Sequence, residues 1–395
     1  MDAASNSIIC SILDNDFYKF TMQHAVIQLF PNAHAKYHFI NRGGHPFPAG
    51  FDKALRSVID LMATLKLSKA EKEFLQKNCP YLAPTYLDFL SGFRFDPAEV
   101  KISQKGAALD VQIEGYWYRT ILWEVPIMAA ICELYYKISG SRRWDDERVS
   151  EVVKDKILHY KNMGVKIAEF GTRRRHSFHV HELVVEALKR YGDGSFTGTS
   201  NVKLAMQFGV KPIGTHAHEW FMFHAARYGF KMSNSLALEN WVNVYRGDLG
   251  IALSDTYTTK VFFESFDKKF SKLFDGVRHD SGDPVTFAKE TIKHYHTFNI
   301  DPLSKTIIFS DGLNPDKVDK IATFCRNKIG MSFGIGTDFT NDVGLEPMNI
   351  VIKMSEAKPE GAQWERVVKL SDEPGKYTGD PDMIALAKTV LGIKS

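Results

Sequence analysis

The chain has 395 residues, 44% of them hydrophobic, and a formal net charge of only +3. It is therefore a folded globular chain that exceeds one ordinary core, since single cores stop growing near ~250–300 residues. The near-neutral charge disfavours a dedicated nucleic-acid or membrane-surface protein, and four scattered cysteines disfavour a disulfide framework. No apolar run approaches the ~18 residues of a membrane span and no signal peptide is visible, so we expect a cytoplasmic protein.

The N-terminal third predicts a mixed α+β unit, because helical spacing and strand-like alternation both occur in it. Ser68 and Glu71 form a capping box that opens a helix. The predicted elements are a helix over 11–30, a strand over 35–40, a helix from residue 51, antiparallel strands over 109–125 and an apolar helix from Pro126 to Tyr136.

After residue 146 the pattern changes to short apolar strands that end in polar, glycine-containing clusters, most of them followed by a helix. Such alternation predicts a parallel sheet. The expected strands are 165–170, 195–197, a strand near 213, 250–253, 273–277, 306–309 and 332–335. Functional-looking residues after each strand favour an irregular α/β (TIM-like) barrel over an open doubly wound sheet, where they would gather at one switch point.

The last predicted strands, 349–353 and 367–370, could return to the N-terminal unit. The expected domains are therefore an α+β domain of residues 1–137 with 354–395, and a barrel domain of residues 138–353.

Two late clusters suit a phosphate group. They are Ser310-Asp311-Gly312 and Gly334-Ile335-Gly336-Thr337, each followed by a helical stretch. Glycines let backbone amides approach an anion, and a helix N-terminus favours it. Tight turns between strand and helix would explain the same glycines, and both readings stay open.

Basic and acidic side chains follow two other strands. Three arginines, 173–175, suit a pyrophosphate or carboxylate because a guanidinium binds such groups bidentately, although a solvated basic turn is the alternative. Arg278 and Asp280 could offer a cation for phosphate and an acceptor for sugar hydroxyls or hydrated Mg²⁺. Asp283 before Pro284 is the pattern of a helix N-cap, so we expect a structural role there.

The pair His216 and His218 has three interpretations. Two histidines at a strand end can bind zinc, as in barrel hydrolases. One of them could instead be a nucleophile or acid–base group, oriented by Glu219. A histidine satisfied within the core is the third.

Taken together, the motifs resemble those of nicotinate phosphoribosyltransferases, in order and spacing over nearly the whole chain. The motifs are Leu13-Asp14-Asn15-Asp16-Phe17-Tyr18-Lys19, Glu169-Phe170-Gly171-Thr172-Arg173-Arg174, Gly198-Thr199-Ser200-Asn201-Val202, Gly214-Thr215-x-Ala217-His218-Glu219-Trp220, Arg278-His279-Asp280-Ser281-Gly282-Asp283-Pro284 and Leu370-Ser371-Asp372.

The resemblance implies that nicotinate reacts with phosphoribosyl pyrophosphate to give nicotinate mononucleotide and pyrophosphate, the first step of NAD salvage from nicotinate. It implies ATP hydrolysis coupled through a phosphohistidine at His218, a requirement for Mg²⁺, and a homodimer whose active site is shared across the interface. Asp280 would be a second catalytic residue, and no residue set is assigned to a metal.

By the same resemblance, Tyr18, Phe170, Arg173, Thr199 and Ser200 would bind nicotinate, with Tyr18 supplied by the neighbouring subunit. The phosphoribosyl and phosphate groups would meet Arg278, Ser310, Asp311, Gly312, Gly334, Gly336 and Thr337. Ser200 stands where the related nicotinamide enzyme carries an aspartate, which would repel a carboxylate. Ser200 therefore favours the acid as substrate.

Three rival readings remain. A phosphoribosyltransferase for nicotinamide or quinolinate is the nearest in chemistry. A zinc-dependent barrel hydrolase using His216 and His218 is distant, since the further ligands are missing. A nucleotide- or RNA-binding protein using arginines 173–175 is disfavoured by the near-neutral charge.

Overall fold

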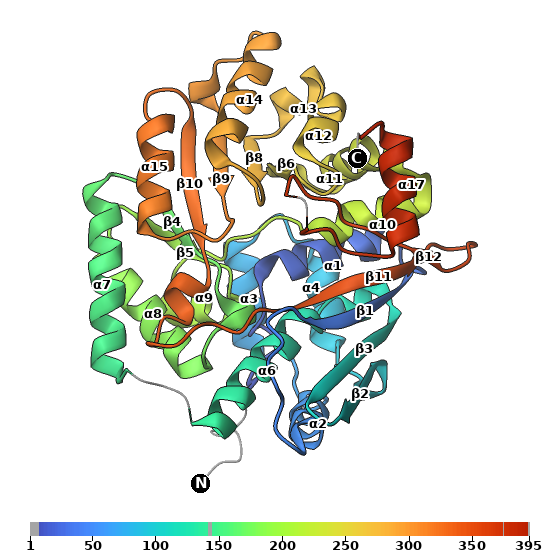
Figure 1. Cartoon of the computed structure of the whole chain (residues 1–395), viewed down its shortest axis with the longest axis vertical. Coiled ribbons are helices and arrows are strands. Elements are labelled where there is room, and N and C mark those ends of the chain that lie inside the picture. The colour runs from blue at the N-terminus through green and yellow to red at the C-terminus, as the bar shows by residue number, and fades with distance from the viewer. Residues whose placement is uncertain (1–7, 141–143, 374, 394–395) are drawn as a thin grey trace.

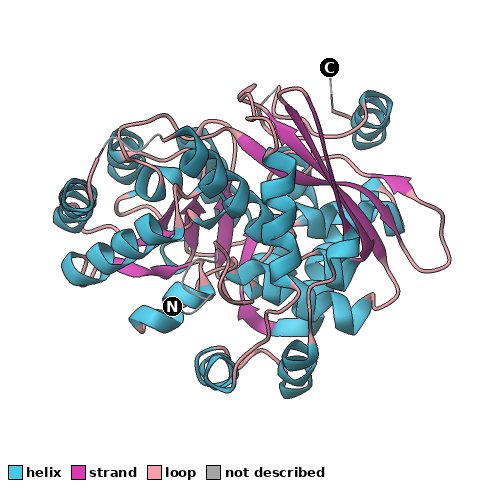
Figure 2. Ribbon diagram, turned by 90° about the horizontal axis from the view of Figure 1, so that it is seen from below, coloured by secondary structure: helices cyan, strands magenta, loops and turns pink. Residues whose placement is uncertain are grey.

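The computed structural model describes residues 8–140, 144–373 and 375–393, and arranges them around two separate sheets (Figures 1 and 2). The antiparallel sheet has the order β12 (Glu365–Arg366), β11 (Ile350–Lys358), β1 (His34–Asn41), β3 (Ala108–Tyr116) and β2 (Val100–Lys105). The parallel sheet has the order β5 (Phe196–Thr199), β4 (Ile167–Glu169), β10 (Gly330–Ile335), β9 (Thr306–Phe309), β8 (Gly276–His279) and β7 (Ile251–Leu253).

Helices cover both sheets. The helices are α1 (Phe17–Leu29), α2 (Phe51–Met62), α3 (Lys69–Asn78), α4 (Pro84–Gly92), α5 (Trp117–Thr120), α6 (Glu124–Ser139), α7 (Asp146–Asn162), α8 (Phe178–Tyr191), α9 (Val202–Phe208), α10 (His218–Tyr228), α11 (Phe230–Tyr245), α12 (Thr259–Ser265), α13 (Lys268–Leu273), α14 (Pro284–Thr297), α15 (Pro315–Cys325), α16 (Thr337–Thr340) and α17 (Pro381–Leu391). In the described part of the chain no helix is long and apolar enough to cross a membrane.

The parallel α/β architecture expected for the second half is confirmed, but a regular barrel is not formed by the described strands. The strand expected near Ile213 is reduced to one parallel bridge between Thr199 and Pro212. Beyond it, the Thr215 hydroxyl donates to the carbonyl of Ile251 at 3.1 Å. Backbone hydrogen bonds join this segment to β5, such as the one from the N–H of Ile213 to the carbonyl of Thr199 at 2.9 Å. On the side of β7, a side-chain contact lies where a strict barrel would have a ladder of backbone hydrogen bonds.

Three predicted elements differ in extent or type. Helix α1 begins at Phe17 rather than at residue 11, because the backbone of Asp16 is still extended and pairs with Asn201. The aromatic run after β3 forms α5 and a turn rather than a strand, and fully buries Trp117. The strand expected over 273–277 begins later, because the Asp267 side chain caps helix α13 just before it.

The two ends of the chain meet in the antiparallel sheet. Strand β11 pairs antiparallel with β1 along the whole of β1, from His34 opposite Lys358 to Asn41 opposite Ile350. Figure 1 shows β11 leaving the region of the parallel sheet and lying beside β1. The expected return is confirmed for the first of the two predicted strands, as β11, whereas the strand expected over 367–370 is reduced to one bridge between Lys369 and Thr378. The domain bounds themselves stay predictions.

Candidate active site

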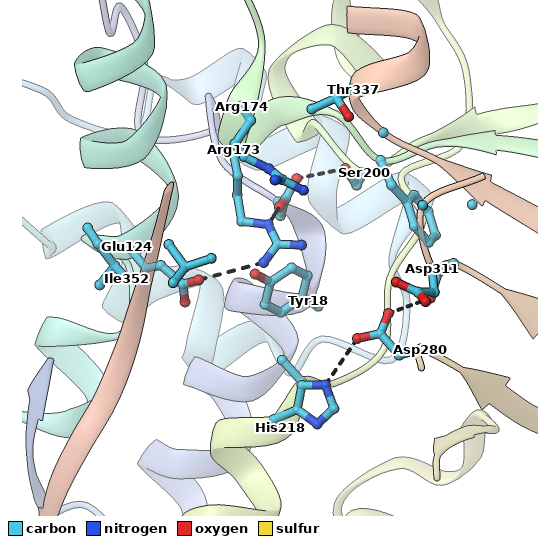
Figure 3. Close-up of a pocket in the computed structure, with 18 of the residues that line it drawn as sticks. Tyr18, Glu124, Arg173, Arg174, Ser200, His218, Asp280, Asp311, Thr337 and Ile352 are labelled. Carbon is cyan, nitrogen blue, oxygen red and sulfur yellow. Dashed lines mark hydrogen bonds and ion pairs between the residues drawn. The ribbon is translucent and has the colours of Figure 1, made fainter. Parts of the chain in front are cut away.

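A cavity of ≈ 720 Å³ lies where the carboxyl ends of the parallel strands face β11 and the start of α1 (Figure 3). Its position follows from the fold, since the loops after parallel strands gather at one edge of the sheet. The predicted residues that line it are Tyr18, Phe170, Arg173, Ser200, His218, Arg278, Asp280, Ser310, Asp311, Gly312, Gly334, Gly336 and Thr337. Thr199 is the one predicted site residue that the cavity wall lacks.

His218 is the first residue of α10, and its ring is held from both sides. Its Nε2 lies 3.1 Å from Oδ2 of Asp280, and its Nδ1 lies 3.0 Å from the hydroxyl of Thr256. Burial, helped by the nearby charge of Lys369 and opposed by Asp255, lowers the pKa of His218 to about 4. The imidazole is therefore neutral near pH 7, and one ring nitrogen keeps the lone pair that a nucleophile needs.

His216 is separated from His218 by one residue but belongs to the core. Its ring is fully buried and packs edge-on against Trp241 at 4.6 Å, while Nε2 accepts a hydrogen bond from the backbone N–H of Leu253. In the described part of the chain, the cluster able to hold a metal joins His218 with Asp255 and Asp280 and does not include His216. The interpretation as a zinc hydrolase is therefore not supported, because it needs both His216 and His218 as metal ligands.

Asp280 connects His218 to the loop after β9. Its Oδ1 accepts from the hydroxyl of Ser310 at 2.7 Å, while Oδ2 contacts His218. Burial opposes ionisation, but Arg278 and His218 outweigh it and hold the pKa of Asp280 well below its usual range. Asp280 is therefore a fixed negative charge on the cavity wall.

The opposite end of the cavity is aromatic and cationic. The ring of Phe170 lies directly beside Gly334, where an added Cβ would come within 2.3 Å of the ring. A glycine at position 334 thus makes room for the Phe170 ring, independently of its predicted role in binding a phosphate. Arg173 lies between two carboxylates, with Nε 3.8 Å from Asp16 and Nη1 3.7 Å from Glu124 (Figure 3).

Tyr18 lies at this end of the cavity, because α1 packs beside the loops that follow the parallel strands. The hydrogen bond from the backbone N–H of Phe17 to the carbonyl of Ser200, 2.7 Å long, holds the start of α1 there. Tyr18 and Phe170 of one chain line the cavity together, and the expectation that a neighbouring subunit supplies this ring stays a prediction.

Ser200 and Thr199 are neighbours in the chain, but their side chains have different surroundings. The hydroxyl of Ser200 faces the cavity and donates to Oδ1 of Asp16 at 2.6 Å. Thr199 is fully buried, and its hydroxyl donates to Glu169 instead. Thr199 therefore holds the loop in place through Glu169. Its buried position does not agree with the predicted contact with a ligand.

The three consecutive arginines have three different environments. Arg175 is fully buried and makes a two-pronged ion pair with Asp14, at 2.6 and 2.8 Å, so its role is structural. Arg173 and Arg174 both line the cavity. The segment turns through a short 3₁₀ helix, Thr172–Arg174, so that Arg173 and Arg174 face the cavity while Arg175 points into the core.

The glycine-containing loops form the remaining wall. Gly312 has a φ of +52°, a conformation that other residues rarely adopt, and it lies in the loop with Ser310 and Asp311. Asp311 pairs with Lys376 at 3.1 Å. Thr337 is the first residue of α16, directly after Gly336. Gly312, Gly336 and Thr337 all line the cavity, and glycines in such loops let backbone amides approach an anion.

Several residues on the cavity wall escaped the sequence analysis. They are Asp16, Arg42, Glu124, Lys353, Lys369 and Lys376. Burial lowers the pKa of Lys353 to about 8, with Arg173 and Lys369 adding to the effect and Glu124 opposing it. Asp16 lies within a quoted motif, but Lys353 is one more residue of an alternating strand, and no local pattern distinguishes it.

Comparison with known proteins gives one consistent family. The nicotinate phosphoribosyltransferase (NAPRTase) family matches residues 165–395, and its N-terminal domain matches residues 13–132. A nicotinate phosphoribosyltransferase of Chromohalobacter salexigens is 64% identical over 383 residues, covering 97% of this chain and 98% of that protein.

Solved structures of the same family have the same fold as this chain. The crystal structure of the nicotinate phosphoribosyltransferase of Porphyromonas gingivalis superimposes with a TM-score of 0.95 at 48% identity, covering 97% of this chain and 99% of that one. The enzyme of the same name from Vibrio cholerae gives a TM-score of 0.93 at 34% identity, covering 99% and 96%.

Proposed function

The chain belongs to the nicotinate phosphoribosyltransferase family, and we propose that the cavity beside β11 is where it joins nicotinate to a phosphoribosyl group. The chain is accordingly an enzyme of NAD salvage. In the reaction, the pyridine nitrogen attacks the anomeric carbon of phosphoribosyl pyrophosphate. The bond from that carbon to the pyrophosphate oxygen breaks, and pyrophosphate leaves with the electron pair.

Nicotinate is assigned to the end of the cavity with Phe170 and Tyr18. Aromatic rings fix the plane of a pyridine, and a guanidinium binds a carboxylate through charge-assisted hydrogen bonds. Arg173 is held by two carboxylates at distances that exceed a hydrogen bond, so its N–H donors remain available. This free but fixed guanidinium beside two aromatic rings is the observation that carries the assignment.

The phosphoribosyl group is assigned to the loops after β8, β9 and β10. Arg278, Ser310, Asp311 and the glycines 312, 334 and 336, with Thr337, would receive the phosphate and ribose. Lys353 and Lys369 also line the cavity and would neutralise the charge that develops on the leaving pyrophosphate. Holding both reactants in line is the main contribution such a site makes to the rate.

ATP is proposed to transfer its γ-phosphoryl group to His218, whose neutral ring is suited to attack phosphorus. Mg²⁺ fits the carboxylates of Asp255 and Asp280, because Oδ1 of Asp255 is buried without a hydrogen-bond partner and oxygen is the ligand that Mg²⁺ prefers. When bound, Mg²⁺ would neutralise phosphate charge. Asp280 would also hold the His218 ring in place through the contact at Nε2.

The assembly is proposed to be a homodimer, as the resemblance implies. Tyr18 and Phe170 of one chain line the same cavity, and the sharing of the active site across the dimer interface is part of this proposal. A cytoplasmic location also stays a prediction. Light scattering during gel filtration would give the mass, to be compared with 44.8 kDa for one chain.

The test of the activity is product formation measured by mass spectrometry. The purified chain would receive phosphoribosyl pyrophosphate, Mg²⁺ and equal amounts of nicotinate, nicotinamide and quinolinate, with and without ATP. We expect nicotinate mononucleotide alone, and more of it with ATP. The amide product or the quinolinate product would overturn the substrate assignment, and equal yields without ATP would overturn the coupling.

The role of Arg173 has its own test. Arg173→Met keeps much of the side-chain volume but removes every donor, so we expect the KM for nicotinate to rise at least about tenfold, the effect of losing a charge-assisted hydrogen bond. The KM for phosphoribosyl pyrophosphate should change much less. An unchanged KM for nicotinate would refute the carboxylate role.

A further inference from the structure

A buried lysine lies behind the nicotinate end of the cavity. Lys19 follows Tyr18 in α1, is 0% exposed and does not line the cavity. Its Nζ lies 2.6 Å from Oε2 of Glu124 and pairs with Oε1 of Glu219. The other oxygen of Glu219 accepts from the hydroxyl of Tyr37 at 2.6 Å. Lys19 is therefore one buried cation shared by two carboxylates that line the cavity.

Glu124 is also shared, between Lys19 and Arg173. Its Oε2 makes the close contact with Lys19, whereas its Oε1 lies 3.7 Å from Nη1 of Arg173. The first distance is that of a charge-assisted hydrogen bond and the second is too long for one. Burial acts to raise the pKa of Glu124, but Lys19 and further cations outweigh it and keep Glu124 ionised.

A carboxylate and a guanidinium this close would ordinarily form a two-pronged pair, because the planar fork of an arginine matches both oxygens. Arg175 and Asp14 show that pair elsewhere in the same chain, at 2.6 and 2.8 Å. Glu124 does not adopt it with Arg173. The difference is that Lys19 already holds one oxygen of Glu124.

We propose that Lys19 is a positioning residue for the nicotinate site, which holds Glu124 away from Arg173 and so keeps the donors of Arg173 free for the substrate carboxylate. The proposal rests on the assignment of nicotinate to Arg173. Without the Lys19 charge, Glu124 turns to Arg173 and competes with nicotinate for the same N–H groups.

The test is the kinetics of Lys19→Met, which keeps most of the length of the side chain and removes its charge. We expect the KM for nicotinate to rise at least about tenfold, while the KM for phosphoribosyl pyrophosphate changes less than about twofold. A second substitution that removes the competitor, Lys19→Met with Glu124→Gln, should bring the nicotinate KM back to within about twofold of Glu124→Gln alone. A purely structural role of Lys19 would instead change both KM values together, in the single variant and in its rescue.

The matched control is Lys269→Met, at an ion pair with Glu239 whose lysine side chain is 51% exposed, and we expect its kinetics to be unchanged. If Lys19→Met fails to fold, the comparison of the double variant with Glu124→Gln still decides. A nicotinate KM raised in the double variant relative to Glu124→Gln overturns the proposal, as does an equal rise in both KM values for Lys19→Met. An unchanged nicotinate KM in Arg173→Met would show that the proposed nicotinate site is wrong. A nicotinate KM that rises in Arg173→Met but not in Lys19→Met would refute the role of Lys19 alone.

Discussion

Ser200→Asp tests the electrostatic basis of the preference for an acid. The Ser200 hydroxyl faces the cavity and donates to Asp16, so a carboxylate at position 200 would place a second negative charge beside Asp16 at the nicotinate end. Nicotinate is an anion and nicotinamide is neutral. The substitution should therefore weaken the binding of the acid and spare the amide.

The size of the effect follows from Coulomb's law. Two unit charges about 4 Å apart interact with about 4 kcal/mol at an effective dielectric constant of about 20. Burial already raises the pKa of Asp16, against Arg173 and Ser200, so the new pair of carboxylates would share a proton part of the time and reduce this repulsion. A loss of about 2–4 kcal/mol remains, which is about 30- to 1,000-fold in affinity.

The assay compares the KM for nicotinate with the inhibition constant of nicotinamide in the same variant. Ser200→Asn is the control, because it has nearly the same size as aspartate and no charge. We expect the nicotinate KM to rise by about 30- to 1,000-fold in Ser200→Asp and much less in Ser200→Asn. Equal losses in both variants, or an equal loss for acid and amide, would refute the electrostatic reasoning and leave only a steric role.

Three further predictions concern ATP coupling, acid stability and the buried ion pair. His218→Gln should abolish the stimulation of product formation by ATP while leaving ATP-independent product detectable, and ADP released in step with product by this variant would contradict the phosphohistidine. Burial is the largest cause that lowers the pKa of His24, His218 and His224 to about 4, so the unfolded chain takes up protons first as the pH falls below about 6.5. Stability should therefore fall between pH 6.5 and 4, by about 2 kcal/mol per histidine at pH 5, and a free energy of unfolding that stays constant from pH 7.5 to 5 in urea titrations would exclude this. Asp14→Asn leaves the buried Arg175 guanidinium without its counter-charge and should cost about 3–5 kcal/mol of stability, measured by denaturant unfolding; a cost below about 1 kcal/mol would show that the pair is solvated.

The sequence by itself determined the capped helix starts, the alternation of strands and helices, and the family. Helix starts depend on contacts within a few residues, so the capping box of Ser68 and the N-cap of Asp283 form as their patterns predict. Short apolar strands between helices predict a parallel sheet for the same reason, and β9 has its predicted bounds. The motifs, taken in order, identified the chemistry that the comparisons support.

The tertiary structure alone decided which members of those motifs face the cavity. Neighbours such as His216 and His218, or Arg173 and Arg175, are alike in type, and only the packing of distant segments buries one and exposes the other to the cavity. Tyr18 enters the site of its own chain because α1 pairs with the loop of Ser200, far along the sequence. The contact of Lys19 with Glu124 joins residues that no periodicity relates, since burial and charge pairing act through space and not along the chain.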